Sequence, residues 1–461
     1  MFSLAGPMSE EHGLTIGEAP PPVSHAELRE RQQALMTHLP TDALLLIVNN
    51  PKAIRSRDVE HPYRANSDML YLVGWDEPNA VVCLHNGSDG WKTRLYVPPR
   101  DVLAETWTGL RPGIEGALAD WPVDEAASVD ELEDGLKPLL DACRSVYHIR
   151  GLSDRVDTLV DSALLEQSRD RQRKGSGPAD LCDPRPLLSE MRLIKSESEL
   201  SQMRHACQIS SLAHIEAMRG STGGVAEYQL QSLIEGCFLW HGSRWAYPSI
   251  VGGGDNATIL HYQDNDGTVA DGDLVLIDAG CEVNGYAADI TRTWPVNGKF
   301  SDAQREIYDI VLNAQLAAID ACRVGNPYDA PHAAARQTMA QGLLDLGVLE
   351  GPNLEEALSV EQLGLWYMHN TGHWLGLDVH DVGVYRPDDE PREFEVGMVI
   401  TVEPGLYFGA WRGDVECPER YAGIGVRIED DVLITDGEPD VLTAACPKEV
   451  AELEALIGTD A

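Results

Sequence analysis

The order of apolar and polar positions predicts two regions of different character along the 461-residue chain. In the first, residues 24–180, helix-like and strand-like patterns alternate. The fully apolar run 43–48 predicts a buried strand, and the runs 79–84 and 93–97 predict two more. Between those two runs, residues 85–90 have the composition of a turn. The pattern indicates an α/β domain.

The second region begins with a helix-start signal and continues as a mixture of helices and strands. Ser196 is followed three positions later by Glu199, which forms a capping box, and apolar residues then recur at helical spacing. A longer helical stretch is predicted over 303–346. Strands separated by glycine-rich turns are predicted at 274–278, 286–294, 398–403 and 425–435. We therefore expect an α+β domain.

Two segments lack either pattern. Residues 1–23 contain three consecutive prolines near their end and predict an irregular tail. Around 173–186 the composition shifts towards Gly, Ser, Pro and Asp, which is typical of a linker. The expected parts are a tail at 1–23, an N-terminal domain at 24–180, a linker at 181–195 and a C-terminal domain at 196–461.

Composition narrows the choice of partners. The chain has 35 Lys and Arg against 75 Asp and Glu, and a net charge of −40. Such a surface repels phosphate backbones and anionic lipids, so nucleic acids and membranes are poor partners. No run is apolar and long enough to span a bilayer. The nine cysteines form no motif, and the N-terminus lacks signal-peptide features, so we expect a cytoplasmic protein with reduced thiols.

Two acids flank a hairpin signal in the C-terminal region. Asp278 ends an apolar run, and the turn signal Asn284-Gly285 lies between it and Asp289. If those two residues form the turn, Asp278 lies diagonal to Asp289 on one sheet face. Two acids beside an apolar strand would be costly without a cation, although an exposed hairpin face could also carry them.

Three further residues are candidates for the same site. Glu403 and Glu429 each end or follow an otherwise apolar run, and His373 lies in a loop rich in glycine and histidine. Taken singly, each could be a turn acid or a hydrogen-bonded structural histidine. Four acids and one histidine in a single domain favour a metal site built mostly from oxygen ligands.

The motifs around these residues resemble the signature of the pita-bread metallopeptidases. Their order and spacing resemble aminopeptidase P, the Xaa-Pro aminopeptidases, over residues 25–457. Asn370 departs slightly from the family pattern, which more often has Gly or Arg at this position. The matching segments are LIDAGC and YAADITRT within 276–293, HWLGLDVHD at 373–381, TVEPGLY at 401–407, GIGVRIED at 423–430, and EHPYRANSD and GWDEP at 60–68 and 74–78.

The resemblance implies a creatinase-like N-terminal domain, a pita-bread catalytic domain and two divalent cations per chain. Asp278 would bind one ion, Asp289 and Glu429 would bridge both, and His373 and Glu403 would bind the other. Oxygen ligands with one imidazole suit Mn²⁺. A hydroxide bridging the ions would attack the carbonyl before proline, and Glu403 would pass a proton to the leaving nitrogen.

The resemblance also implies residues that contact the substrate. His380 would stabilise the oxyanion, and His369 joins it and Glu403 in the catalytic set. His261 and His369 would line the proline pocket. Trp107 would reach a neighbouring subunit's active site, in a homodimer or homotetramer, although a tryptophan is more often a core residue. Weaker candidates for substrate binding are Tyr247, Arg427, Asp58 and Tyr385.

The expected activity is removal of the first residue from peptides with proline in second position. The nearest alternative is a prolidase restricted to Xaa-Pro dipeptides, but the stretch 415–421 resembles the aminopeptidases more closely. A methionine aminopeptidase would not need residues 25–180. A non-catalytic pita-bread binding protein or a creatinase-like hydrolase typically lacks metal ligands, and none is missing here.

Overall fold

The computed structural model describes residues 14, 16–351, 353–359 and 361–459. They form two compact units, one of residues 23–192 and one of residues 193–459 together with the N-terminal segment up to Pro22. Of the expected tail, residues 1–13 and 15 lie outside the described part, and residues 14 and 16–23 form no helix or strand. Leu14 and Ile16 pack against the core of the C-terminal unit.

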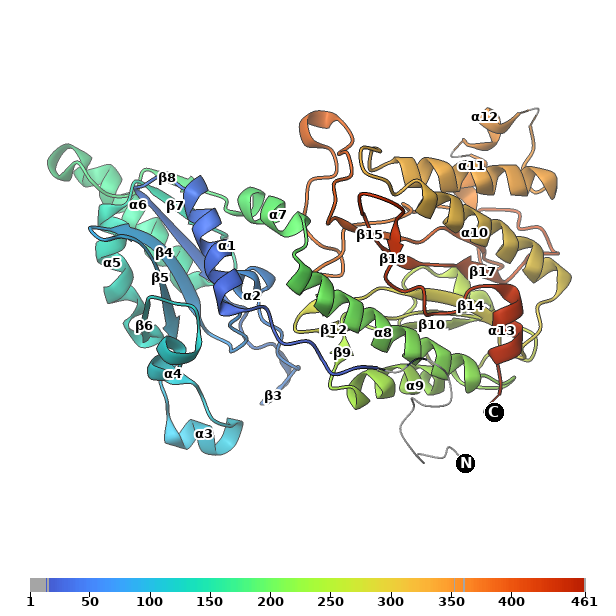
Figure 1. The fold of residues 1–461 in the computed structure, drawn as a ribbon, viewed down its shortest axis with the longest axis horizontal. Coiled ribbons are helices and arrows are strands. Elements are labelled where there is room, and N and C mark those ends of the chain that lie inside the picture. The colour runs from blue at the N-terminus through green and yellow to red at the C-terminus, as the bar shows by residue number, and fades with distance from the viewer. Residues whose placement is uncertain (1–13, 15, 352, 360, 460–461) are drawn as a thin grey trace. The chain divides into compact units, whose positions relative to one another are not determined.

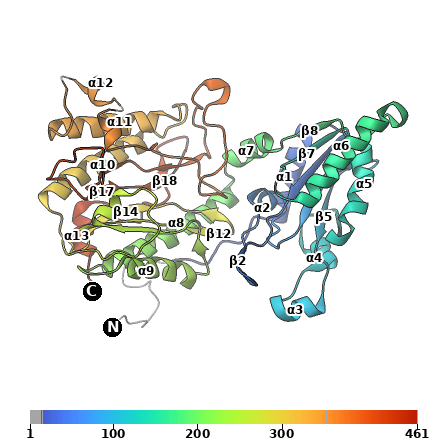
Figure 2. The same cartoon turned by 180° about the vertical axis from the view of Figure 1, so that it is seen from behind.

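The N-terminal unit is built on a six-stranded sheet in the order β6-β5-β4-β1-β7-β8. The predicted strand 43–48 is confirmed as β1, and all six of its residues are buried. Helix α1 (His25–His38) lies on one face of the sheet and α6 (Asp154–Lys174) on the other, as Figures 1 and 2 show. The remaining strands are β4 (Val81–Gly87), β5 (Gly90–Val97), β6 (Glu125–Ser128), β7 (Ser145–His148) and β8 (Asp180–Cys182).

Two sequence expectations in this unit differ from the structure. The turn predicted over 85–90 is shorter, because the ladder between β4 and β5 continues to the pair Gly87 and Gly90. The segment 181–195, expected to be a linker, contains the end of β8 and the helix α7 (Arg185–Leu193). It is therefore largely regular structure.

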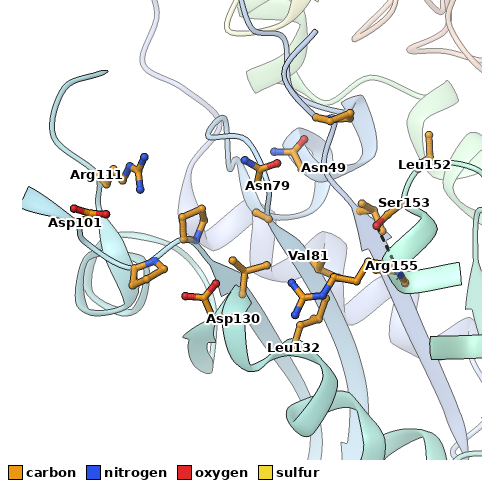
Figure 3. Close-up of a pocket in the computed structure, with 17 residues that line it drawn as sticks. Asn49, Asn79, Val81, Asp101, Arg111, Asp130, Leu132, Leu152, Ser153 and Arg155 are labelled. Carbon is orange, nitrogen blue, oxygen red and sulfur yellow. Dashed lines mark hydrogen bonds between the residues drawn. The ribbon is translucent and has the colours of Figure 1, made fainter. Parts of the chain in front are cut away.

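A cavity of about 470 Å³ opens at the carboxyl ends of strands β1, β5 and β6 (Figure 3). Its polar lining includes Arg111 and Arg155 together with Asp101 and Asp130. Arg155 also pairs with Glu133 at 3.4 Å. The two acids balance the two arginines, so the lining has no marked charge of either sign.

The C-terminal unit places strands between two pairs of helices, as both ribbon views show. One pair is α8 (Glu197–Arg219) and α9 (Glu227–Trp240), and the predicted capping box of Ser196 and Glu199 begins α8. The stretch 303–346 forms two helices, α10 (Asp302–Asp320) and α11 (Ala330–Asp345), because Gly325 with φ 83° and Pro327 interrupt it. No helix in the described part of the chain is long and apolar enough to cross a membrane.

A long hairpin crosses the centre of this unit. Its inner part pairs β12 (Cys281–Val283) with β13 (Tyr286–Ala287), and its outer part pairs β11 (Leu274–Asp278) with β14 (Thr291–Pro295). The other strands that carry site residues are β15 (Val399–Val402), β16 (Gly405–Phe408), β17 (Ile424–Arg427) and β18 (Asp430–Leu433). Breaks in these strands leave the acids Asp289, Glu403 and Glu429 between elements.

Candidate metal centre

The predicted hairpin turn brings Asp278 and Asp289 together. Asn284 and Gly285 have φ values of 50° and 86°, as a two-residue turn of this kind requires. The register is the same in both parts of the hairpin, so Gly280 faces Asp289. A Cβ atom on Gly280 would lie only 1.8 Å from the carbonyl oxygen of Ala288, so this close approach requires glycine.

Tyr247 connects the two acids. Its hydroxyl lies 2.7 Å from Asp278 Oδ1 and 2.5 Å from Asp289 Oδ1. Burial, followed by the charges of these two acids, raises the pKa of Tyr247 well above its usual value, so the phenol keeps its proton. Tyr247 was expected in the substrate cleft, but its hydroxyl is directed at the two acids.

His373 and Glu429 complete a cluster with Asp289. One ligand atom from each of the three residues lies within 4.8 Å of the others. His373 Nδ1 is 3.0 Å from the carbonyl oxygen of Trp374, which leaves Nε2 facing Asp289 Oδ2 at 3.5 Å. Glu403 Oε1 is 3.8 Å from the same Nε2 atom. The five predicted metal ligands therefore line one pocket.

The electrostatics of this cluster favour a bound cation. Burial, followed by the negative charge of Asp289, raises the pKa of Glu429 well above its usual range. Burial and the neighbouring acids likewise raise the pKa of Glu403 to about 7. Burial lowers the pKa of His373, but Asp289 and Glu403 outweigh this and raise it to about 9. The raised pKa values of Glu403 and Glu429 favour the protonated carboxyl groups, and divalent ions on their oxygen atoms would replace those protons.

Arg427 places a permanent positive charge among the acids. Its Nη2 atom donates to Asp278 Oδ2 at 2.7 Å, and its Nε atom donates to Thr291 Oγ1 at 3.0 Å. Thr291 in turn donates to Glu429 Oε2 at 2.6 Å. The expected substrate residue Arg427 thus holds two candidate metal ligands, one directly and one through Thr291.

The ring of His369 is fixed at both nitrogen atoms. Nδ1 lies 2.7 Å from the carbonyl oxygen of Asn370, and Nε2 lies 2.8 Å from the Tyr407 hydroxyl, which also accepts from Arg427 Nη1. Burial, followed by the charge of Arg427, lowers the pKa of His369 to about 3. A neutral ring with both nitrogen atoms occupied is suited to forming a pocket wall, not to exchanging protons with a substrate.

The remaining predicted residues of the C-terminal unit line the same cavity, which has a volume of about 410 Å³. His380 is exposed, and its ring meets that of His373 edge to face at a centroid distance of 4.3 Å. His261 and Tyr385 are also in the lining. Tyr328, which the sequence analysis missed, joins them, and its ring packs at a tilt against that of Tyr385 with centroids 4.4 Å apart.

Two predicted substrate residues, Asp58 and Trp107, belong to the N-terminal unit. Asp58 is exposed between β2 (Ile54–Ser56) and β3 (Val59–Glu60). Trp107, in α3 (Val102–Thr108), is 88% exposed, so the alternative interpretation of this residue as part of the core is wrong.

Comparison with known proteins agrees with this geometry. The model of metallopeptidase family M24 matches residues 201–436, and that of the aminopeptidase P N-terminal domain matches residues 28–147. The chain is 43% identical to the Xaa-Pro aminopeptidase of Escherichia coli, over 94% of this chain and 98% of that protein.

Solved structures of aminopeptidase P are also similar to this chain. The structure of aminopeptidase PepP from Pseudomonas aeruginosa is similar with a TM-score of 0.89 and 40% identity, covering 95% of this chain and 99% of that one. Zinc-substituted Escherichia coli aminopeptidase P in complex with product is similar with a TM-score of 0.90 and 43% identity, covering 96% and 100% of the two chains. Both units are covered, and the chain belongs to the Xaa-Pro aminopeptidases of metallopeptidase family M24.

Proposed function

We propose that this chain uses two divalent cations to release the first residue from peptides that have proline in second position. One observation carries the proposal: Asp289, His373 and Glu429 bring their ligand atoms within 4.8 Å of one another in a pocket that also contains Asp278 and Glu403. Relatives that match 94% of this chain are Xaa-Pro aminopeptidases.

The donor set fits a pair of hard divalent ions. Asp278 would hold one ion, His373 and Glu403 the other, and Asp289 and Glu429 would be shared. Carboxylate oxygen atoms with a single imidazole suit Mn²⁺ better than an ion that prefers thiolates. Such ions, when bound, neutralise the acids and supply a water nucleophile that is active at neutral pH.

His380 would donate a hydrogen bond during the reaction, and Glu403 would transfer a proton. His380 is exposed on one side, but its partial desolvation in the pocket, followed by the neighbouring His373, lowers its pKa, so the ring is neutral and donates one N–H. It would donate that hydrogen bond to the scissile carbonyl oxygen as negative charge develops there. Glu403 would accept a proton from the attacking water and deliver it to the proline nitrogen as that nitrogen leaves.

The pocket also explains a preference for proline. An Xaa-Pro bond has no N–H and a restricted φ, so recognition must depend on the shape of the ring. The imidazoles of His261 and His369 lie in the pocket lining beside Leu260. The faces of the two imidazole rings and the apolar side chain of Leu260 would pack against a proline ring.

We further propose a homodimer or homotetramer in the cytoplasm. The apolar side chains of Val102, Leu103, Trp107 and Leu110 are 77–88% exposed on and just after α3. An apolar group of this kind is typical of an association surface. All nine cysteines are free thiols, which agrees with a reducing compartment.

Metal analysis tests the proposal. The purified protein should bind about two divalent ions per chain, and chelation should abolish cleavage of an Xaa-Pro peptide. Mn²⁺ should restore the activity. Full activity of metal-free protein would contradict the proposed site.

A further inference from the structure

The proposed proline pocket depends on a histidine whose ring has no hydrogen bond to any of the described residues. His261 lies in a loop of residues 254–266, which begins with η2 (Gly254–Thr258) and precedes β11, and its ring lines the metal pocket. Its side chain is exposed. The position of the imidazole therefore follows the backbone of its loop, and whatever fixes this backbone fixes one wall of the pocket.

One buried carboxylate, Glu227, accepts four hydrogen bonds from this loop and from the residues on either side of it. Glu227 is the first residue of α9 and is only 1% exposed. Its Oε1 atom accepts from the backbone N–H of Gly253 at 2.8 Å and from Asn256 Nδ2 at 2.9 Å. Its Oε2 atom accepts from the backbone N–H of Gly267 at 2.7 Å and from the Tyr262 hydroxyl at 2.9 Å.

These contacts bracket His261. Gly253 precedes the loop, Gly267 follows it, and Tyr262 is the residue next to His261. The approach at Gly267 is so close that a Cβ atom there would lie 2.9 Å from Glu227 Oε2. Glu227 thus ties the two ends of the loop and the neighbour of His261 to the start of a buried helix.

A carboxylate is needed because each of its two oxygen atoms accepts one backbone N–H. A glutamine has one oxygen atom and one NH₂ group. In either orientation of that amide, the N–H of Gly253 or of Gly267 would face another donor. The loop would keep its other supports, since Leu260 and Tyr262 pack on an apolar cluster and Asn265 accepts from Val251 N at 2.9 Å. We expect the loop to shift and the fold to survive.

We propose that Glu227 is a positioning residue for proline recognition, which acts by fixing the His261 loop through Tyr262, Gly253 and Gly267. The inference rests on the proposed function, because it assigns His261 to the pocket for the proline ring. Glu227 does not line that pocket, so its effect on the substrate must pass through the loop.

A double-mutant cycle tests the inference on the Mn²⁺-loaded protein. Glu227→Gln should lower kcat/KM for an Xaa-Pro-Yaa peptide by about tenfold, since small displacements of substrate-contacting groups cost one to two orders of magnitude. Metal content should be unchanged. In a His261→Ala background, Glu227→Gln should change the rate by less than about twofold, because the group that it positions is absent.

Glu199→Gln is the matched control. Glu199 is also buried, in the first turn of α8, and accepts from the Tyr286 hydroxyl at 3.0 Å, but it does not line the metal pocket. It should leave kcat/KM within about twofold of the unmodified protein, as expected for an independent site. If Glu227→Gln fails to fold, Tyr262→Phe enters the same cycle and should lower the rate less, but again only when His261 is present.

Equal losses in the presence and absence of His261 would overturn the inference, and so would an unchanged rate in the Glu227→Gln protein. Failure of the unmodified, metal-loaded protein to cleave any Xaa-Pro peptide would contradict the proposed function itself, which separates the two outcomes.

Discussion

Arg427 Nη2 lies 2.7 Å from Asp278 Oδ2, and the two side chains are only 4% and 12% exposed. This ion pair places a permanent positive charge beside one of four carboxylates. A single arginine cannot neutralise all four. Burial, followed by the charges of neighbouring acids, raises the pKa values of Asp289 and Glu429. The pocket is therefore arranged for divalent cations even before one binds.

Loss of a shared ligand should remove the metals. Asp289→Ala or Glu429→Ala should reduce bound metal and leave almost no turnover, because both proposed ions depend on each of these carboxylates. Elemental analysis of purified protein measures this directly. Asp271→Ala, at an exposed acid of the same unit, should keep normal metal content. Normal metal content in the Asp289→Ala protein would show that the hairpin does not form the site.

Tyr247→Phe should weaken metal binding without abolishing it. The hydroxyl orients both Asp278 and Asp289, and removal of such an outer partner typically costs about 10–100-fold in metal affinity or activity. Titration of metal-free protein with Mn²⁺ in a calorimeter measures the change. Tyr228→Phe, at a residue that is 58% exposed, is the control and should bind as the unmodified protein does. Unaltered affinity after Tyr247→Phe would rule out the supporting role.

His380→Ala should retain both metals and lose rate. A hydrogen bond that forms fully only in the transition state affects kcat more than substrate binding. The loss of one such donor costs about 10²–10³ in kcat. Steady-state kinetics and metal analysis on one preparation separate the possibilities. Loss of metal would make His380 a ligand or its support, and normal turnover would make it structural. His38→Ala, at an exposed histidine that ends α1, should have no effect.

Trp107→Ala should affect activity while leaving the fold intact. The side chain is 88% exposed, so its loss should change the free energy of unfolding by less than about 0.5 kcal/mol. If it reaches the active site of a partner subunit, cleavage of peptides should fall at constant metal content. Trp240→Ala, at another tryptophan that is 62% exposed, provides the control. Full activity of the Trp107→Ala protein would contradict the intersubunit role.

Much of the fold followed from local patterns. The run 43–48 is apolar at every position because both faces of its sheet are covered, and the Asn284-Gly285 turn sets the hairpin register. The break in the helical stretch 303–346 was missed because helical periodicity continues on both sides of Gly325. The turn predicted at 85–90 was too long, because the polar residues His85 and Asn86 belong to the ladder between β4 and β5.

The metal ligands of the site could be predicted from the sequence, but the residues that support them could not. The five candidate ligands lie in recognisable motifs, and the structure places them in one pocket. The role of Tyr247 could not be predicted, because its partners are 31 and 42 residues away along the chain. The role of Glu227 was not predicted, because an acid in the first turn of a helix is common. Only the tertiary structure shows that residues on either side of the His261 loop donate hydrogen bonds to it.

The chain length of accepted peptides tests the central claim most directly. With Mn²⁺ present, the release of the first residue should be measured on Xaa-Pro-Yaa, Xaa-Pro and Xaa-Ala-Yaa peptides with the same first residue. We predict that Xaa-Pro-Yaa is cleaved at least as well as Xaa-Pro, that Xaa-Ala-Yaa is poorly cleaved, and that chelation stops all cleavage. Cleavage confined to the Xaa-Pro dipeptide, or cleavage that survives complete removal of metal, would contradict the assignment.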